Sequence, residues 1–418
     1  MRLERTLWKV FSIQRDELRF ALPLFALYLL SGSFYAIGQI ITETLFLKAY
    51  GAAGLSRFFI FNGIALIVGG VVYTNIVTRF SLRKGYLALI LLFSSLIVAG
   101  AHAPLYEYSW VPFYLYLGNY LFTFFLDIHF FNYATQFCNV RSAKRILPFV
   151  MAGGKMGGIV SSLLIFWRFS QDIETVGLLW WAINGFLLVG PLALLRKKNA
   201  GVLPPASRSD DDLLGGRGLM GLLADKLAAT YSSPIFLYSA LAVFVMSVAN
   251  QVSEYYFASI FNAAFTSKRD LAAFLSAYTV LADGATLLLQ MLVVSRLITA
   301  IGVKKSNVLY PLSFIGSIVL ALSFPTLVAG VLLRFYRKHL SVLVRAPVFN
   351  VIMAAAPAER LTAVKSFIGG IISPLGMIAG GGAIMLVFSR FEPAIVSAIA
   401  IAIGLAYVGF TLLQNRAY

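Results

Sequence analysis

Long uninterrupted apolar runs constrain the fold of this chain more than any other feature of its sequence. Several of them, such as 20–44 and 234–258, exceed the ~20 residues that a helix needs to cross a bilayer. The composition agrees, because 60% of the residues are hydrophobic and 12% are charged, whereas soluble proteins carry about 25% charged residues. The sequence therefore predicts an integral membrane protein with the lipid bilayer as its surroundings.

Twelve such runs follow one another, and basic residues gather in every second loop between them. Examples are the loops 79–84, 141–145 and 304–305. Because positive loops stay on the cytoplasmic side, both termini are expected in the cytoplasm. The same loops account for most of the net charge of +17, which therefore does not indicate nucleic-acid binding. The predicted spans are 20–44, 57–78, 86–104, 110–134, 147–168, 176–195, 234–258, 271–297, 307–327, 328–353, 362–388 and 393–414.

Two pairs of matching segments, half a chain apart, indicate an internal repeat. Glu43 in the first span corresponds to Glu254 in the seventh, and Ala143-Lys144-Arg145-Ile146 corresponds to Ala358-Glu359-Arg360-Leu361. Six spans in each half give both halves the same orientation, as in the major facilitator architecture. We expect an all-α bundle of 12 transmembrane helices in two parallel six-helix repeats. The domains would be 1–198 with a short cytoplasmic amphipathic leader, a cytoplasmic linker at 199–233 with an amphipathic surface stretch, and 234–418.

Short motifs spread over nearly the whole chain carry a family resemblance. They are Arg15-Asp16-Glu17-Leu18, Thr44-Leu45-Phe46-Leu47, Gly153-Gly154-Lys155-Met156-Gly157-Gly158, Glu254-Tyr255-Tyr256-Phe257 and Pro374-Leu375-Gly376. Together they resemble the bacterial and plastid ATP/ADP translocase family, in particular its uncharacterised bacterial branch. The resemblance implies a major facilitator fold, transport ancestry and a place in the bacterial inner membrane.

The same comparison argues against ATP/ADP exchange itself. The nucleotide exchangers carry an Arg-Asp-Thr-Lys-Asp run in span 1, where this chain has Gln39-Ile40-Ile41-Thr42-Glu43. Their span-11 run Leu-Gly-Lys-Ser-Gly-Gly corresponds to Leu375-Gly376-Met377-Ile378-Ala379-Gly380. A triphosphate needs several cations, and two of the expected lysines are replaced.

Ionisable and amide side chains inside spans 1 and 7 are the first candidate site. A carboxylate within the bilayer is costly and indicates function. We expect Glu43 and Glu254 to flank the outer mouth of a central cavity and to hold a proton or a cationic group, with Gln39 and Gln251 one turn deeper. The alternative is that both carboxylates simply reach the outer headgroups.

Lys155 in span 5 and Asp283 in span 8 are the second candidate. Spans 5 and 8 of the major facilitator fold face each other, so we expect an ion pair between the two halves of the sequence. Such a pair would break and reform as the halves rock. The alternatives are a static pair or two unrelated cavity residues.

Span 10 carries an unusual number of basic residues for a membrane helix. So much charge must face a wet cavity, an acidic partner helix or anionic headgroups. A cavity would favour an anionic substrate; alternatively, the span is broken and lies at the cytoplasmic interface. The residues on one predicted face are Arg334, Lys338, Ser341 and Arg345, with Arg337 and His339 beside them.

A smaller polar cluster in span 4 contains Asp127, His129, Asn132 and Tyr133. Asp127 is expected either to relay protons or pair with a span-10 arginine, or to be a structural hydrogen-bonded group. The single cysteine, Cys138, excludes an intrachain disulfide. No catalytic, metal or cofactor motif stands out, so we expect a non-enzyme without cofactors.

These observations favour a secondary active transporter that works by alternating access. Its substrate would be a small organic anion or zwitterion, phosphorylated compounds included. Two alternatives remain: a transport-inactive subunit or assembly factor of a larger membrane complex with protein partners, and a lipid flippase. A continuous polar cavity would favour transport, a packed interior a structural role, and a lateral opening lipid flipping.

Overall fold

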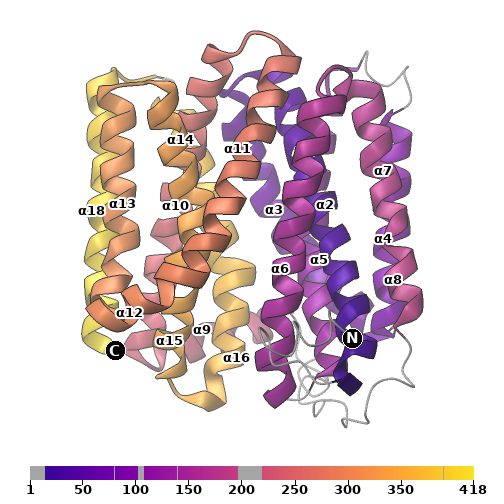
Figure 1. Ribbon diagram of the computed structural model, residues 1–418. Helices are drawn as coiled ribbons and strands as arrows, with labels where there is room; N and C mark the ends of the chain where they lie inside the picture. The colour runs from indigo at the N-terminus through magenta and orange to yellow at the C-terminus, as the bar shows by residue number, and fades with distance from the viewer. Residues whose placement is uncertain (1–14, 80, 102–107, 139, 196–218, 389) are drawn as a thin grey trace. The chain divides into compact units, whose positions relative to one another are not determined.

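The computed structural model describes residues 15–79, 81–101, 108–138, 140–195, 219–388 and 390–418. All regular structure within these ranges is helical (Figure 1). Ten helical stretches among the described residues are long and apolar enough to cross a membrane. The two other predicted spans, 110–134 and 328–353, are also helical. Most of the predicted leader, residues 1–19, lies in 1–14 and most of the predicted linker lies in 196–218, both outside the described residues, and residues 15–19 form the start of the first described helix.

The described chain divides into two compact units. Unit 1 comprises 1–49, 71–208 and 267–287, and unit 2 comprises 50–70, 209–266 and 288–418. The units differ from the predicted sequential halves, because each contains part of a helix from the other half. Most of α11 (Lys268–Leu289) belongs to unit 1, and the first part of α3 (Gly54–Arg79) belongs to unit 2.

Unit 1 is built from long helices with short π-wound turns at Ile165–Phe169 and Ile173–Gly177. Phe34 packs against Phe122 and Trp181 in its interior. The other helices of unit 1 are α2 (Arg15–Tyr50), α4 (Leu82–Ala101), α5 (Val111–Ala134), α6 (Val140–Leu164), α7 (Leu178–Leu187) and α8 (Val189–Leu194).

Glycines allow α2 and α6 to approach closely within unit 1. A Cβ atom added at Gly157 would overlap the backbone oxygen of Leu29, and one added at Gly32 would overlap the backbone of Gly154. Such small residues are typical of close helix packing in membranes. This contact fixes the position of α6 relative to α2. Lys155, which lies between the two glycine pairs, is therefore held at a fixed position next to α2.

Unit 2 is organised around α10 (Pro234–Ala264), which contacts α14, α17 and α18. Its core includes the fully buried Phe236, Val348 and Ile352. Helix α9, in the predicted amphipathic stretch, packs against α16 and α10. The remaining helices are α9 (Leu219–Tyr231), α12 (Ser295–Ile301), α13 (Val303–Ser323), α14 (Leu327–Phe335), α15 (Ala346–Ala354), α16 (Ala358–Phe367), α17 (Ser373–Ala383) and α18 (Pro393–Ala417), joined in part by π-wound turns.

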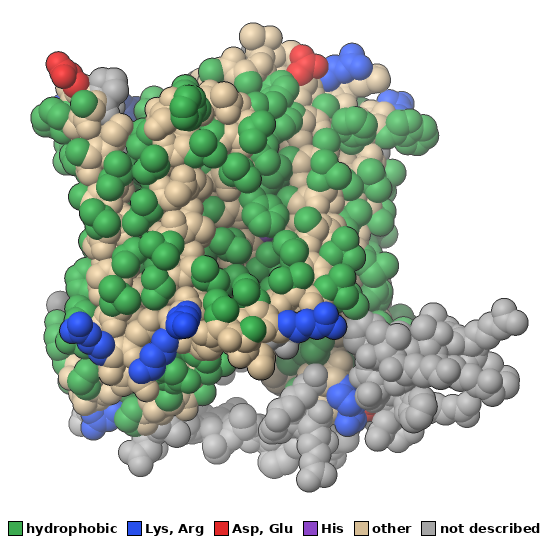
Figure 2. Space-filling view, turned by 60° about the vertical axis from the view of Figure 1, so that its left-hand side comes forward, with side chains coloured by type: hydrophobic (Ala, Val, Ile, Leu, Met, Phe, Trp, Pro, Cys, Tyr) green, Lys and Arg blue, Asp and Glu red, His purple; other side chains and the backbone are tan. Residues whose placement is uncertain are grey.

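The surface of unit 2 matches a membrane environment. Large apolar side chains such as Leu312 on α13 and Leu405 on α18 are 51% and 59% exposed. Figure 2 shows hydrophobic side chains along the middle of the visible face, several Lys and Arg side chains toward one end, and a few more beside acidic side chains at the other end. The exposed Lys304 and Lys305 begin α13 at its basic end. The all-α, polytopic part of the fold prediction is confirmed.

Candidate functional site

A buried ion pair between Glu254 of α10 and Arg337 is the central feature of unit 2. The Arg337 guanidinium contacts the Glu254 carboxylate, and the two side chains are only 12% and 2% exposed. Arg337 Nε also donates a hydrogen bond of 3.1 Å to the backbone oxygen of Asn250, one turn earlier on α10. Two anchor points on one helix therefore hold the guanidinium.

The Asn250 side chain also accepts hydrogen bonds from two tyrosine hydroxyls. Tyr310 of α13 donates to Asn250 Oδ1 at 3.2 Å, and Tyr336 donates to the same atom at 3.5 Å. An amide oxygen has two lone pairs and can accept both. The two tyrosine rings stack with centroids 4.6 Å apart. Asn250 thus joins α10, α13 and the segment that carries Arg337.

Two further basic residues of span 10 are held by aromatic side chains of the same unit. Arg345 Nε donates to the Tyr407 hydroxyl at 3.3 Å, and its guanidinium lies 4.3 Å from the centre of the Phe349 ring. Arg334 is 1% exposed and lies 5.2 Å from the centre of the Phe257 ring. Contacts of this kind stabilise a cation that has lost its water.

The winding of span 10 differs from the sequence prediction. Residues Tyr336–Arg345 form a π-helical stretch between α14 and α15, so the spacing of 3.6 residues per turn does not hold there. The predicted single face from Arg334 to Arg345 is therefore wrong in its geometry. Helical structure is continuous from Leu327 to Ala354, so the span is not broken, and its alternative location at the cytoplasmic interface stays a prediction. Span 10 was predicted to face a wet cavity, an acidic partner helix or anionic headgroups. Arg337 faces the second of these, because it contacts Glu254 of α10.

In unit 1 the candidate residues of span 1 contact each other. Gln39 Nε2 donates to Glu43 Oε2 at 2.7 Å, and the residues are 5% and 2% exposed. Gln251 of unit 2 is 2% exposed and packs against Gly380 of α17, where an added Cβ would lie 2.9 Å from the Gln251 Cβ. Both glutamates are buried in protein, which argues against the headgroup alternative. Their place at a cavity mouth stays a prediction.

Lys155 and Asp283 form an ion pair inside unit 1. Lys155 Nζ lies 2.6 Å from Asp283 Oδ1, with side chains 30% and 11% exposed. A Cβ added at Gly158, one turn along α6, would lie 3.2 Å from Asp283 Oδ2. The pair thus joins α6 to α11 at a site that a glycine keeps open. Its role as a gate stays a prediction.

The span-4 cluster is tied into the interior of unit 1. His129 Nε2 contacts the Leu82 backbone oxygen, and its Nδ1 lies 2.8 Å from the Tyr73 hydroxyl. Because a carbonyl oxygen only accepts, we assign the ring proton to Nε2. The Tyr133 hydroxyl donates to the Leu195 backbone oxygen at 3.1 Å. These contacts make a structural role for His129 and Tyr133 the simpler interpretation. Asp127 itself is partly exposed.

Sequence reasoning placed Arg337 only beside the basic face and gave no role to Asn250, Tyr310 or Tyr336. One signal was available: Asn250 and Glu254 are four residues apart and share a face of α10. The tyrosines lie on other helices, so no local spacing connects them to this face.

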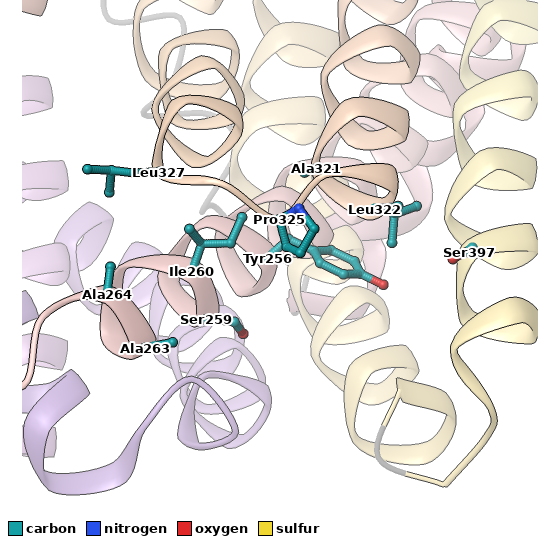
Figure 3. A pocket seen from close by; sticks show the side chains of 10 residues that line it. All are labelled: Tyr256, Ser259, Ile260, Ala263, Ala264, Ala321, Leu322, Pro325, Leu327 and Ser397. Atoms are coloured by element: carbon teal, nitrogen blue, oxygen red, sulfur yellow. The ribbon is translucent and has the colours of Figure 1, made fainter.

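A cavity in unit 2 lies elsewhere and is lined mainly by apolar residues. It has a volume of about 660 Å³. Figure 3 shows its lining from α10, α13, α14 and α18. None of the predicted site residues lines it.

Comparison with solved structures identifies the fold class. The chain resembles the nucleoside transporter NupG at 13% identity, covering 97% of this chain and 98% of that one with a TM-score of 0.62. A D-xylose-proton symporter matches at 14% identity over 94% and 96%, with a TM-score of 0.65. A variant of the peptide transporter POT matches at 13% identity over 97% and 98%, with a TM-score of 0.65.

These matches confirm the predicted major facilitator fold. Within the described residues the chain has the all-α, multi-pass architecture of that fold, with ten helical stretches long and apolar enough to cross a membrane. A scan of the sequence against protein-family models finds no match, and a search of curated proteins finds no similar sequence.

Proposed function

We propose that the chain is a secondary active transporter that moves a small organic anion or zwitterion across the bacterial inner membrane by alternating access. We place it in the divergent bacterial branch of the ATP/ADP translocase-like family, with both termini in the cytoplasm. The observation that carries the proposal is the buried Glu254–Arg337 pair inside a major facilitator fold. A charge pair inside membrane helices is expensive to keep and marks a substrate or ion pathway.

The chemistry of the pair suggests how a substrate would use it. An anionic group competes with the Glu254 carboxylate for the Arg337 guanidinium, whose planar donors match carboxylate and phosphate oxygens. The Glu254 carboxylate that is released then binds either the amine of a zwitterionic substrate or a proton from solvent. Asn250 and the two tyrosines hold the surrounding helices in register while the partner of Arg337 changes.

The remaining candidates fit supporting roles in the same proposal. Glu43 with Gln39, and Asp127, are candidates for coupling the movement to protons, and Gln251 for substrate contact. The Lys155–Asp283 pair, which joins helices from the two halves of the sequence, is a candidate gate that opens in one state and closes in the other.

Transport by the purified full chain in liposomes tests the proposal. The panel of labelled compounds contains organic phosphates, carboxylates, amino acids, ATP and ADP, preloaded for counterflow. We expect saturable accumulation of at least one small anion or zwitterion, loss of it in Arg337→Gln, and no loss in Glu174→Gln, which removes an exposed ion pair with Lys268. If the folded protein accumulates none of these compounds, transport of this substrate class is refuted. Accumulation of ATP or ADP alone would refute the assignment to smaller anions.

A second candidate is a membrane subunit or assembly factor that has lost transport. One observation favours it: Arg334, Arg337 and Arg345 all contact side chains of unit 2 itself. In that case Arg337→Gln lowers thermal stability and weakens the complex isolated from membranes in mild detergent, while liposomes show no uptake by the unmodified chain.

A further inference from the structure

The cavity in unit 2 is bounded by the ends of four helices. Its lining comes from the last turns of α10 and α13, the start of α14 and the first turns of α18 (Figure 3). Lys304 and Lys305 lie at the opposite end of α13, roughly 25 Å away along the helix axis. The cavity therefore lies toward the end of unit 2 that is far from these basic residues. Its lining residues are Tyr256, Ser259, Ile260, Ala263, Ala264, Ala321, Leu322, Pro325, Leu327 and Ser397.

The lining is suited to a long apolar group. It contains no charged residue, and its small side chains, such as Ala263 and Ala321, leave a volume of about 660 Å³. That volume lies within the range of sites that hold a small molecule, about 300–1,000 Å³. Polar atoms in the lining side chains come from the hydroxyl groups of Tyr256, Ser259 and Ser397. The lining therefore combines an apolar body with a few hydrogen-bonding groups.

The residues at the rim of the cavity indicate whether its ligand comes from water or from the bilayer. Apolar side chains close to lining residues in the sequence are exposed: Phe324 and Val328, directly beside Pro325 and Leu327, are 64% and 67% exposed, and Ile395, two residues before Ser397, is 44% exposed. A rim in water would be predominantly polar. Two of the helices that border the cavity, α13 and α18, are long and apolar enough to span the bilayer, so such a rim faces hydrocarbon or the lipid interface.

We propose that this cavity binds one acyl chain of a bilayer lipid. The chain enters between α13, α14 and α18, and the hydroxyl groups of Tyr256, Ser259 and Ser397 lie toward the ester region of the lipid. Tyrosine is enriched near the membrane interface, and Tyr256 lies eight residues before the end of α10, about 12 Å along its axis. Tyr256 follows Glu254 by two residues, on another face of α10 from the ion pair. A bound acyl chain therefore stabilises α10 on a face that does not contact Arg337.

The test measures thermal unfolding of the full chain in a fixed detergent while saturated lysophosphatidylglycerols of increasing acyl length are titrated. We expect the apparent affinity to rise by up to about fourfold per added methylene, the transfer value for lipid chains. The rise should stop when the chain outgrows the cavity. Ala263→Phe fills the cavity and should abolish this dependence. Ala402→Phe makes the same change at an exposed position on α18 and should preserve it.

Three outcomes would overturn the proposal. The first is an equal dependence on chain length in both variants, which would assign the effect to the detergent surface. The second is an absence of stabilisation at every chain length in the unmodified protein. The third is stabilisation by soluble aromatic compounds or sugars, lost in Ala263→Phe, because these ligands would come from water. Since no transport is measured, these outcomes are independent of the proposed function.

Discussion

Replacing Glu254 by glutamine should destabilise unit 2 strongly. The substitution keeps the size of the side chain but leaves the Arg337 guanidinium, only 12% exposed, without its carboxylate. Arginine stays protonated in proteins, so the buried charge persists in the variant. The hydrogen bond to the Asn250 oxygen remains and compensates only part of the loss.

The magnitude follows from the burial of both partners. Removing one member of a buried ion pair costs about 3–5 kcal/mol, and each 1.4 kcal/mol is about a factor of ten in the equilibrium constant. The ratio of folded to unfolded protein should therefore fall by a factor of about 100 or more. The double variant Glu254→Gln, Arg337→Gln should recover part of this loss, because the isolated charge is then removed.

The assay is thermal unfolding of purified protein in detergent, followed by size-exclusion chromatography of the heated samples. The matched control is Glu174→Gln, since the Glu174 and Lys268 side chains are 41% and 49% exposed and an exposed pair contributes at most about 1 kcal/mol. If Glu254→Gln costs no more than the control, or if the double variant equals the sum of its single variants, the Glu254–Arg337 pair does not have the energetic role described.

Three other changes test separate parts of the structure. Gly157→Ala should destabilise by about 1–3 kcal/mol because its Cβ would overlap the Leu29 oxygen, whereas Gly118→Ala, with open space around it, should stabilise slightly; both are measured by thermal unfolding. Gln414→Leu should cost about 2 kcal/mol in the same assay, because it removes hydrogen bonds to side chains of α13 and α10. Alkylation of Cys138 by N-ethylmaleimide should rise about tenfold per pH unit from neutral pH upward, because burial, with a smaller contribution from a nearby carboxylate, raises the thiol pKa from 9.0 to about 11.

Each of these predictions has an opposing result. Equal effects of the two glycine substitutions would remove the argument for close contact between α2 and α6. An unchanged unfolding temperature for Gln414→Leu would mean that its bonds exchange freely with water. The sign of the thiol prediction follows from the raised pKa: the reactive thiolate is scarce below about pH 11 and increases as the pH rises. A reaction rate that levels off near pH 8 would contradict it.

The course of the helices was predictable from the sequence because membrane spans depend on local composition. The predicted span 307–327 corresponds to α13 at Val303–Ser323, and the predicted span 393–414 to α18 at Pro393–Ala417. Both rest on the length of an apolar run, which does not depend on the rest of the fold. The cost of burying charge likewise pointed to Glu254 and to the basic span 10.

The partner of Glu254 was not predictable in the same way. Arg337 and Glu254 lie 83 positions apart, and the contact depends on how α10 packs against the π-wound stretch Tyr336–Arg345. The prediction assumed 3.6 residues per turn, which grouped Arg334 with Lys338 and left Arg337 to one side. Local spacing therefore identified the charged helix but not which of its side chains faces α10.

The division into two units also bears on how the chain is made. Unit 1 needs residues 267–287, which leave the ribosome after the first helices of unit 2. Domains generally fold during synthesis as their residues become available, so unit 1 must wait, nearly complete, until α11 is inserted. Lys155 lacks its carboxylate partner in the membrane during that interval, because Asp283 has yet to be synthesised. A nascent chain that stalls before α11 therefore lacks both the Lys155–Asp283 pair and the packing of α11 in unit 1.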